Sequence, residues 1–110
     1  MTANRLPSPP RYLSATSRAW WSSVVAAYEL DSSGLKLLSE AASALDRIGQ
    51  ARVVIESEGL IYRDRFNVPR RHPAVTIESE ARTSFARLLR ELDLEGAVLP
   101  DPHPPRRGRR

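Results

Sequence analysis

Apolar residues recur at helical spacing in three segments of this 110-residue chain. Ser14 can cap a first helix, and the apolar steps of three and four residues predict that this helix ends near Tyr28. A longer helix is predicted from about Ser33 to Glu58, a stretch without proline, and Gly59 stands where a helix-ending residue with left-handed backbone is expected. The apolar stripe of this long helix consists of Leu37, Ala41, Ala44, Ile48, Ala51 and Ile55.

Proline at position 73 suits the first turn of a third helix, which is predicted to continue to Gly96. Its apolar stripe contains Ile77, Ala81, Phe85, Leu88 and Leu92. Residues 60–71 mix β-forming residues with the turn residues Asp64 and Asn67, a composition that favours a small hairpin. The predicted fold class is therefore mostly α, a three-helix unit with one long central helix, a short β-like hairpin before the last helix, and flexible termini.

The two ends of the chain differ in composition from its middle. Residues 1–13 include Pro7, Pro9 and Pro10, and we expect a flexible, extended segment outside the core. Residues 97–110 are rich in proline and arginine, and they are predicted to form a disordered basic tail. The helical core and oligomerisation domain then covers residues 14–96. Asp31 or a neighbouring serine is the expected cap of the long helix.

The long helix spans nearly 40 Å at about 1.5 Å per residue, whereas a three-helix unit of this size is only about 30 Å across. Its stripe needs a cover along its whole length, and two covers are open: a second copy of the chain, or the third helix packed as a simple hairpin. Gly49, beside the stripe, is expected to mark close packing.

Trp21 points about 100° away from its neighbour Trp20 and must meet another surface. The candidate oligomer interface is Trp21, Leu37, Ala41, Ala44, Ile48, Ala51 and Ile55.

Positive charge is concentrated in two places, although the net charge of the chain is only +4. Residues 60–72 hold four arginines against one aspartate, and so do the last ten residues. Arginine contacts phosphate well, so these two groups are the candidate DNA-binding residues. They are Arg63, Arg65, Arg70 and Arg71 in the predicted hairpin and Arg106, Arg107, Arg109 and Arg110 in the tail. The alternative is a solvated loop whose Tyr62 and Phe66 insert into the hydrophobic core.

Residue types needed for catalysis are scarce. The chain has no cysteine and two histidines, His72 and His103, which together offer neither a thiolate nucleophile nor a familiar zinc motif. No glycine-rich phosphate loop is present, and the single lysine, Lys36, precedes leucine instead of Ser or Thr. We therefore expect no catalytic residues, no metal and no cofactor. No apolar run is long enough to span a membrane, and no signal peptide is recognisable at the start.

The first two predicted helices and their glycine-containing turn also invite comparison with a helix-turn-helix. The outward residues of the long helix sum to zero charge, which disfavours its use as a recognition helix. They are Lys36, Ser39, Glu40, Ser43, Asp46, Arg47 and Gln50.

Several short landmarks occur in a characteristic order between about residues 13 and 94. They are Leu13-Ser14, Trp20, Glu58-Gly59-Leu60, Arg71-His72-Pro73-Ala74, Ile77 and Glu91-Leu92-Asp93-Leu94. In this order they resemble the P27 family of phage terminase small subunits. The chain departs from the family pattern at Asp93, where glycine is more usual and would end the helix cleanly.

The resemblance implies a non-catalytic subunit that assembles into a ring-like homo-oligomer and engages double-stranded viral DNA. It also implies a second partner, the large terminase subunit with its ATPase and nuclease, in the cytoplasm of an infected bacterial host. Two alternatives are a small helical DNA-binding regulator and a structural adaptor, neither with a role in packaging.

Overall fold

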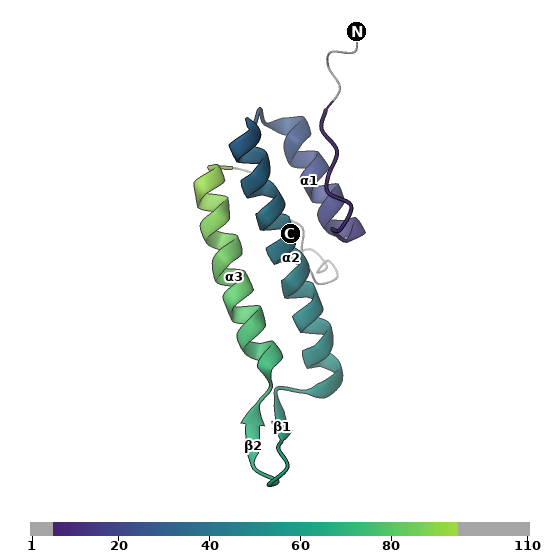
Figure 1. Ribbon diagram of the computed structural model, residues 1–110, viewed down its shortest axis with the longest axis vertical. Helices are drawn as coiled ribbons and strands as arrows, with labels where there is room; N and C mark the ends of the chain where they lie inside the picture. Colours follow the sequence, from purple (N-terminus) through teal and green to yellow (C-terminus); the bar gives the residue numbers. More distant parts are fainter. Residues whose placement is uncertain (1–5, 95–110) are drawn as a thin grey trace, which may run out of the picture.

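The computed structural model describes residues 6–94 and contains three helices and one two-stranded sheet within that range. In order these are α1 (Ala15–Ala27), α2 (Ser32–Glu58), β1 (Ile61–Arg63), β2 (Pro69–Arg71) and α3 (Pro73–Leu92). Helix α2 is central, with α1 on one side and α3 on the other, and the strands project beyond the ends of α2 and α3 (Figure 1). The predicted fold class, a mostly helical three-helix unit with a short hairpin before the last helix, is confirmed.

Side chains just outside each helix satisfy backbone N–H groups that the first helical turn leaves unpaired. The Ser14 hydroxyl accepts from the Ser17 amide at 3.2 Å, and the Asp31 carboxylate accepts from the Gly34 amide at 2.8 Å. At the start of α3 the Nδ1 atom of His72 accepts from the Ala74 amide at 3.1 Å, and Pro73 is the first helical residue. The predicted helix starts and the caps at Ser14 and Asp31 are confirmed.

Residues with positive φ end the two long helices. Gly59 follows α2 with φ 87° and ψ 174°, so the predicted position and the positive φ are right, but ψ lies outside the left-handed helical region. Asp93 takes the left-handed conformation itself, with φ 58° and ψ 48°, and its amide donates to the carbonyls of Leu89 and Arg90. Aspartate tolerates this conformation better than most residues. The prediction that the third helix continues to Gly96 is therefore wrong, because α3 ends at Leu92.

The hydrophobic core lies where all three helices meet. Leu38 of α2 is completely buried, and the Trp20 ring packs against Phe85 of α3 with centroids 5.6 Å apart. Trp21 is only 3% exposed, and its Nε1 donates to the Ser39 hydroxyl of α2 at 3.1 Å. The expectation that Trp21 occupies an outer surface is wrong, because Trp21 is buried and bonded to α2. Trp20 contacts α3 instead.

The apolar stripe of α2 is largely covered by α3, the helix with which α2 makes most of its contacts. Ala41, Ile48 and Ala51 are buried within the single chain. Leu37, Ala44 and Ile55 remain half-buried. The simple helical hairpin therefore accounts for the buried part of the stripe, and these residues are not available to a second copy.

Two further expectations about packing are wrong. Residues 1–13 were expected outside the core, but Leu13 is buried and belongs to the core cluster with Trp21 and Leu38. A methyl group added at Gly49 would meet no atom within 4 Å, so this glycine does not mark close packing inside the chain. It lies instead beside a groove between the start of α1 and α2, which the exposed side chain of Val53 also lines.

A carboxylate of α2 fixes the start of α1. Asp46 accepts hydrogen bonds from the Ser14 amide at 2.8 Å, from the Ser14 hydroxyl at 2.5 Å and from the buried Ser17 hydroxyl at 2.6 Å. These bonds join residues about 30 positions apart in sequence, and they hold α1 against the upper half of α2 only (Figure 1).

Candidate nucleic-acid interface

The segment between α2 and α3 forms an antiparallel β-hairpin, called the hairpin below (residues 61–71). Ile61 pairs with Arg71, Tyr62 with Arg70 and Arg63 with Pro69. The Asn67 amide donates to the Asp64 carbonyl at 2.8 Å, and Asn67 has φ 63°. A turn of this kind followed by a left-handed residue is a common three-residue hairpin connection. Asp64 and Asn67 therefore form the turn, as the sequence predicts.

The Asp64 carboxylate organises the tip of the hairpin. One oxygen accepts from the amides of Phe66 at 2.8 Å and Val68 at 3.0 Å, and the other accepts from Nε of Arg70 at 2.9 Å. The Val68 amide first, and then the Arg70 guanidinium, hold the pKa of Asp64 below its usual value of 3.8, against a smaller effect of desolvation. The tip is thus set by polar contacts and does not depend on burial of its own apolar side chains.

The four hairpin arginines do not form one patch. Side chains alternate between the two faces of a strand, so the observed register puts Arg63 and Arg71 on one face and Arg70 on the other. Arg70 is partly neutralised there by its ion pair with Asp64. Arg65 lies in the turn, where its guanidinium sits 5.3 Å from the centre of the Phe66 ring. The cationic surface therefore consists of Arg63, Arg71 and the tip residue Arg65.

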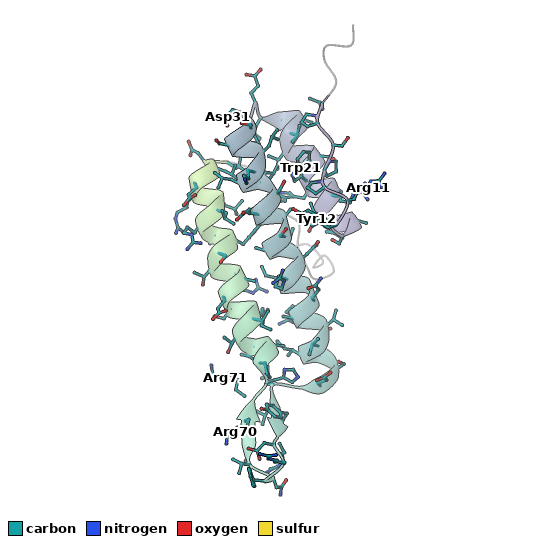
Figure 2. The ribbon with its side chains drawn as sticks, viewed as in Figure 1. Arg11, Tyr12, Trp21, Asp31, Arg70 and Arg71 are labelled. Carbon is teal, nitrogen blue, oxygen red and sulfur yellow. The ribbon has the colours of Figure 1, made fainter. Side chains whose placement is uncertain are left out.

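Both aromatic residues of the hairpin are exposed, so the alternative in which they insert into the core is wrong. Phe66 is 73% exposed, and Tyr62 is also exposed. Every residue of β1 and β2 is exposed. The exposed large apolar residues of the hairpin and its base are Leu60, Ile61, Tyr62, Phe66 and Val68. Figure 2 shows Arg70 and Arg71 at the far end of the molecule from Trp21 and Tyr12.

His72 ties the base of the hairpin to both long helices. Its Nε2 lies 2.7 Å from a carboxylate oxygen of Glu58, and its amide donates to the Leu60 carbonyl at 2.7 Å. Because Nδ1 accepts from the Ala74 amide, the proton of the neutral ring is on Nε2 and is donated to Glu58. The Tyr62 ring meets the His72 ring edge-on at 6.1 Å. This contact set anchors an otherwise exposed hairpin.

The landmarks of the family resemblance coincide with these structural positions. Residues 58–60 end α2, residues 71–74 start α3, and the Glu58–His72 contact joins the two groups. Residues 91–94 contain the left-handed Asp93 that ends α3. Much of the resemblance thus lies in residues that cap helices and fix the hairpin base.

No family model, curated protein or solved structure matches the chain. The resemblance to terminase small subunits therefore stays a prediction.

The helix-turn-helix interpretation is disfavoured by the position of α2. Two of its supposedly outward residues, Ser39 and Asp46, accept hydrogen bonds from α1, and the helix lies between α1 and α3 (Figure 1). A recognition helix must be free to enter a groove of DNA.

The remaining sequence predictions concern the tail arginines, metal binding and membrane-spanning helices. The tail arginines Arg106, Arg107, Arg109 and Arg110 lie outside the described residues. Within residues 6–94, no three His, Cys, Asp or Glu side chains gather to hold a metal ion. Over the same range, none of the helices combines the length and apolar character needed to cross a bilayer.

Proposed function

We propose that this chain is a non-catalytic terminase small subunit that engages double-stranded viral DNA and regulates a large subunit carrying the packaging ATPase and nuclease. The observation that carries the proposal is the hairpin, an exposed two-stranded element with Arg63 and Arg71 on one face and Arg65 at its tip. The order of the family-like landmarks supports the packaging role.

Charge distribution favours DNA as the ligand of the hairpin. Four arginines oppose one carboxylate in the hairpin, whereas residues 1–59 carry equal numbers of basic and acidic groups. Guanidinium groups bind phosphate oxygens in bidentate geometry, and phosphate contacts supply most of the affinity of sequence-independent DNA binding. The hairpin extends away from the helices, so a duplex can approach it without meeting α1 (Figure 1).

The test of DNA binding compares two double variants of equal charge. Arg63→Ala/Arg71→Ala removes both arginines of one hairpin face, and Arg18→Ala/Arg87→Ala removes two exposed arginines of α1 and α3. Fluorescence anisotropy with a labelled duplex over a salt series should show that the hairpin variant flattens the slope of log affinity against log salt by about 2 units. The helix variant should leave that slope nearly unchanged. Equal effects of the two variants would refute the hairpin as the contact surface.

The basic tail can be measured in the same assay. Deleting residues 106–110 removes four arginines. If all four contact phosphate, the salt slope should flatten by about 3 to 4 units. An unchanged slope would mean that the tail does not contact DNA and binds either the large subunit or no ligand.

The packaging role needs its own experiment. If a large terminase subunit is encoded beside this chain, that protein should co-purify with it, and its ATPase rate should change when this chain is added. Tight, sequence-specific DNA binding without any such effect would favour the small regulator, and no DNA binding at physiological salt would favour the structural adaptor.

We also propose a homo-oligomer, with a contact surface that differs from the stripe expected from sequence. A groove between the start of α1 and α2 is lined on the α2 side by Leu45, Gly49 and Val53 at four-residue steps, of which Leu45 is buried and Val53 is exposed. Val53→Arg should weaken self-association measured by native mass spectrometry, whereas Ala86→Arg, at an exposed position of α3, should not. A wild-type chain that is monomeric at tens of micromolar, the usual range for such assays, contradicts this proposal.

A further inference from the structure

The tip of the hairpin presents an aromatic ring to solvent. Phe66 is 73% exposed, whereas Trp20 and Trp21 are buried. Single exposed apolar residues are ordinary on protein surfaces, but this ring lies on an element that projects from the helices and carries several other exposed apolar residues. Arg65 precedes it in the turn, and Arg63, Arg70 and Arg71 lie in the two strands.

Polar contacts fix the backbone that carries the ring. The Phe66 amide is bound by the Asp64 carboxylate at 2.8 Å, and the turn closes through the Asn67 amide and the Asp64 carbonyl at 2.8 Å. Nε of Arg70 binds the same carboxylate from β2 at 2.9 Å. The backbone of the tip is therefore preorganised before any ligand arrives, which lowers the entropy that this backbone loses on binding.

One cationic group contacts the ring, and a second lies in the same turn. The Arg65 guanidinium lies 5.3 Å from its centroid, and the Arg63 guanidinium donates to the Asn67 carbonyl at 2.9 Å, one residue beyond the ring. A flat apolar group flanked by guanidinium groups is complementary to a ligand that alternates flat stacking surfaces with negative charge. Double-stranded DNA has this chemistry, because its base pairs are stacked between two phosphate backbones.

We infer that Phe66 is a wedge that enters between two base pairs of double-stranded DNA and kinks the duplex, while Arg63, Arg65 and Arg71 contact the flanking phosphates. Apolar side chains of DNA-bending proteins act in this way and produce kinks of roughly 20–90°. The inference rests on the proposed DNA-binding function and adds to it a named residue and a deformation of the DNA.

The experiment measures affinity and bending separately. A duplex of about 30 base pairs, long enough for a bend to shorten its end-to-end distance, carries a fluorescent donor and acceptor at its two ends. Anisotropy reports binding, and energy transfer between the ends reports bending. The proteins are the wild type, Phe66→Ala, Phe66→Leu and the control Tyr12→Ala, which removes an aromatic ring that is 71% exposed on the N-terminal segment.

The wild type, Phe66→Leu and Tyr12→Ala should all raise energy transfer on binding. Phe66→Ala should lose most of that rise and bind roughly tenfold more weakly, because its arginines still contact phosphate while the stacking contact is gone. Melting temperatures should be equal in all four proteins, since neither aromatic ring is part of the core.

Two results would overturn the wedge and leave DNA binding intact: binding by the wild type without a rise in energy transfer, and an undiminished rise with Phe66→Ala. The second result would assign the ring to a protein partner. Failure of the wild type to bind any duplex would refute the proposed DNA-binding function and the wedge together.

Discussion

The three helices and the hairpin differ in how their apolar residues are used. In the helices, large side chains such as Trp20, Trp21 and Leu38 are covered by other parts of the same chain. In the hairpin, Ile61 and Phe66 are exposed, and the order of the segment comes from Asp64 and its hydrogen bonds. Contacts within the chain account for the apolar residues of the helices, whereas the exposed apolar residues of the hairpin led us to propose a ligand for it.

The largest expected effect is a loss of stability when a buried apolar residue of the helices is truncated, compared with an exposed one of the hairpin. Leu38→Ala removes a side chain that is 0% exposed and should lower the free energy of unfolding by about 2–5 kcal/mol. Ile61→Ala removes a side chain that is 61% exposed, and the change should stay within about 0.5 kcal/mol. Urea denaturation monitored by circular dichroism measures both. Comparable losses in the two variants would mean that the hairpin is covered by protein in solution.

A second comparison uses two aspartates that each accept three hydrogen bonds. Asp46→Ala leaves the buried Ser17 hydroxyl without its acceptor and should destabilise the protein by about 1–3 kcal/mol. Asp64→Ala removes the contacts to Phe66, Val68 and Arg70 and should leave the unfolding midpoint nearly unchanged. Amide hydrogen exchange should instead become faster in the hairpin alone. A large drop in the midpoint for Asp64→Ala would show that the helices depend on the hairpin.

A substitution at Gly49 should have a smaller effect and should raise stability instead of lowering it. A methyl group at this position meets no atom within 4 Å, so Gly49→Ala should stabilise the monomer by about 1 kcal/mol through helix propensity alone. If a second copy packs against this groove, the variant should also weaken self-association. Thermal melts of the variant and the wild type at low and high protein concentration distinguish the two effects. If Gly49→Ala melts at a lower temperature than the wild type at low concentration, the packing described here is contradicted.

The pH dependence of the hairpin should be local and small. Because the pKa of folded Asp64 lies below 3.8, its hydrogen bonds stabilise the tip fully above that pH and are lost as the pH falls through the lowered pKa. The amide resonances of Phe66 and Val68 should report this titration with a midpoint below 3.8. Asp64→Asn should show no such transition. A midpoint above 3.8 would mean that the carboxylate is not held in its ionised form.

Local sequence signals predicted most of the fold. The caps at Ser14 and Asp31, the proline at position 73 and the turn residues of the hairpin act through their immediate neighbours, so their positions are readable from the chain. The end of α3 was misplaced because Asp93 adopts a left-handed backbone that sequence rules assign first to glycine.

Features that depend on tertiary packing were harder to predict. The burial of Trp21 needs a partner residue, Ser39, on another helix, and the open space at Gly49 depends on how far α1 extends along α2. At the candidate site, the sequence identified the four arginines but not their division between two faces, which follows from the strand register. It also left open whether Phe66 is buried, because an aromatic ring suits a core and an interface equally.

The central claim, that the hairpin is the part of the described chain that engages DNA, is tested most directly by nuclear magnetic resonance. A short DNA duplex is titrated into the isotopically labelled protein, and the amide resonances are followed residue by residue. We predict that the largest shifts occur in residues 60–71, with small changes in α1 and in the exposed face of α2. Largest shifts in α1 and α2, with the hairpin resonances unmoved, would contradict it.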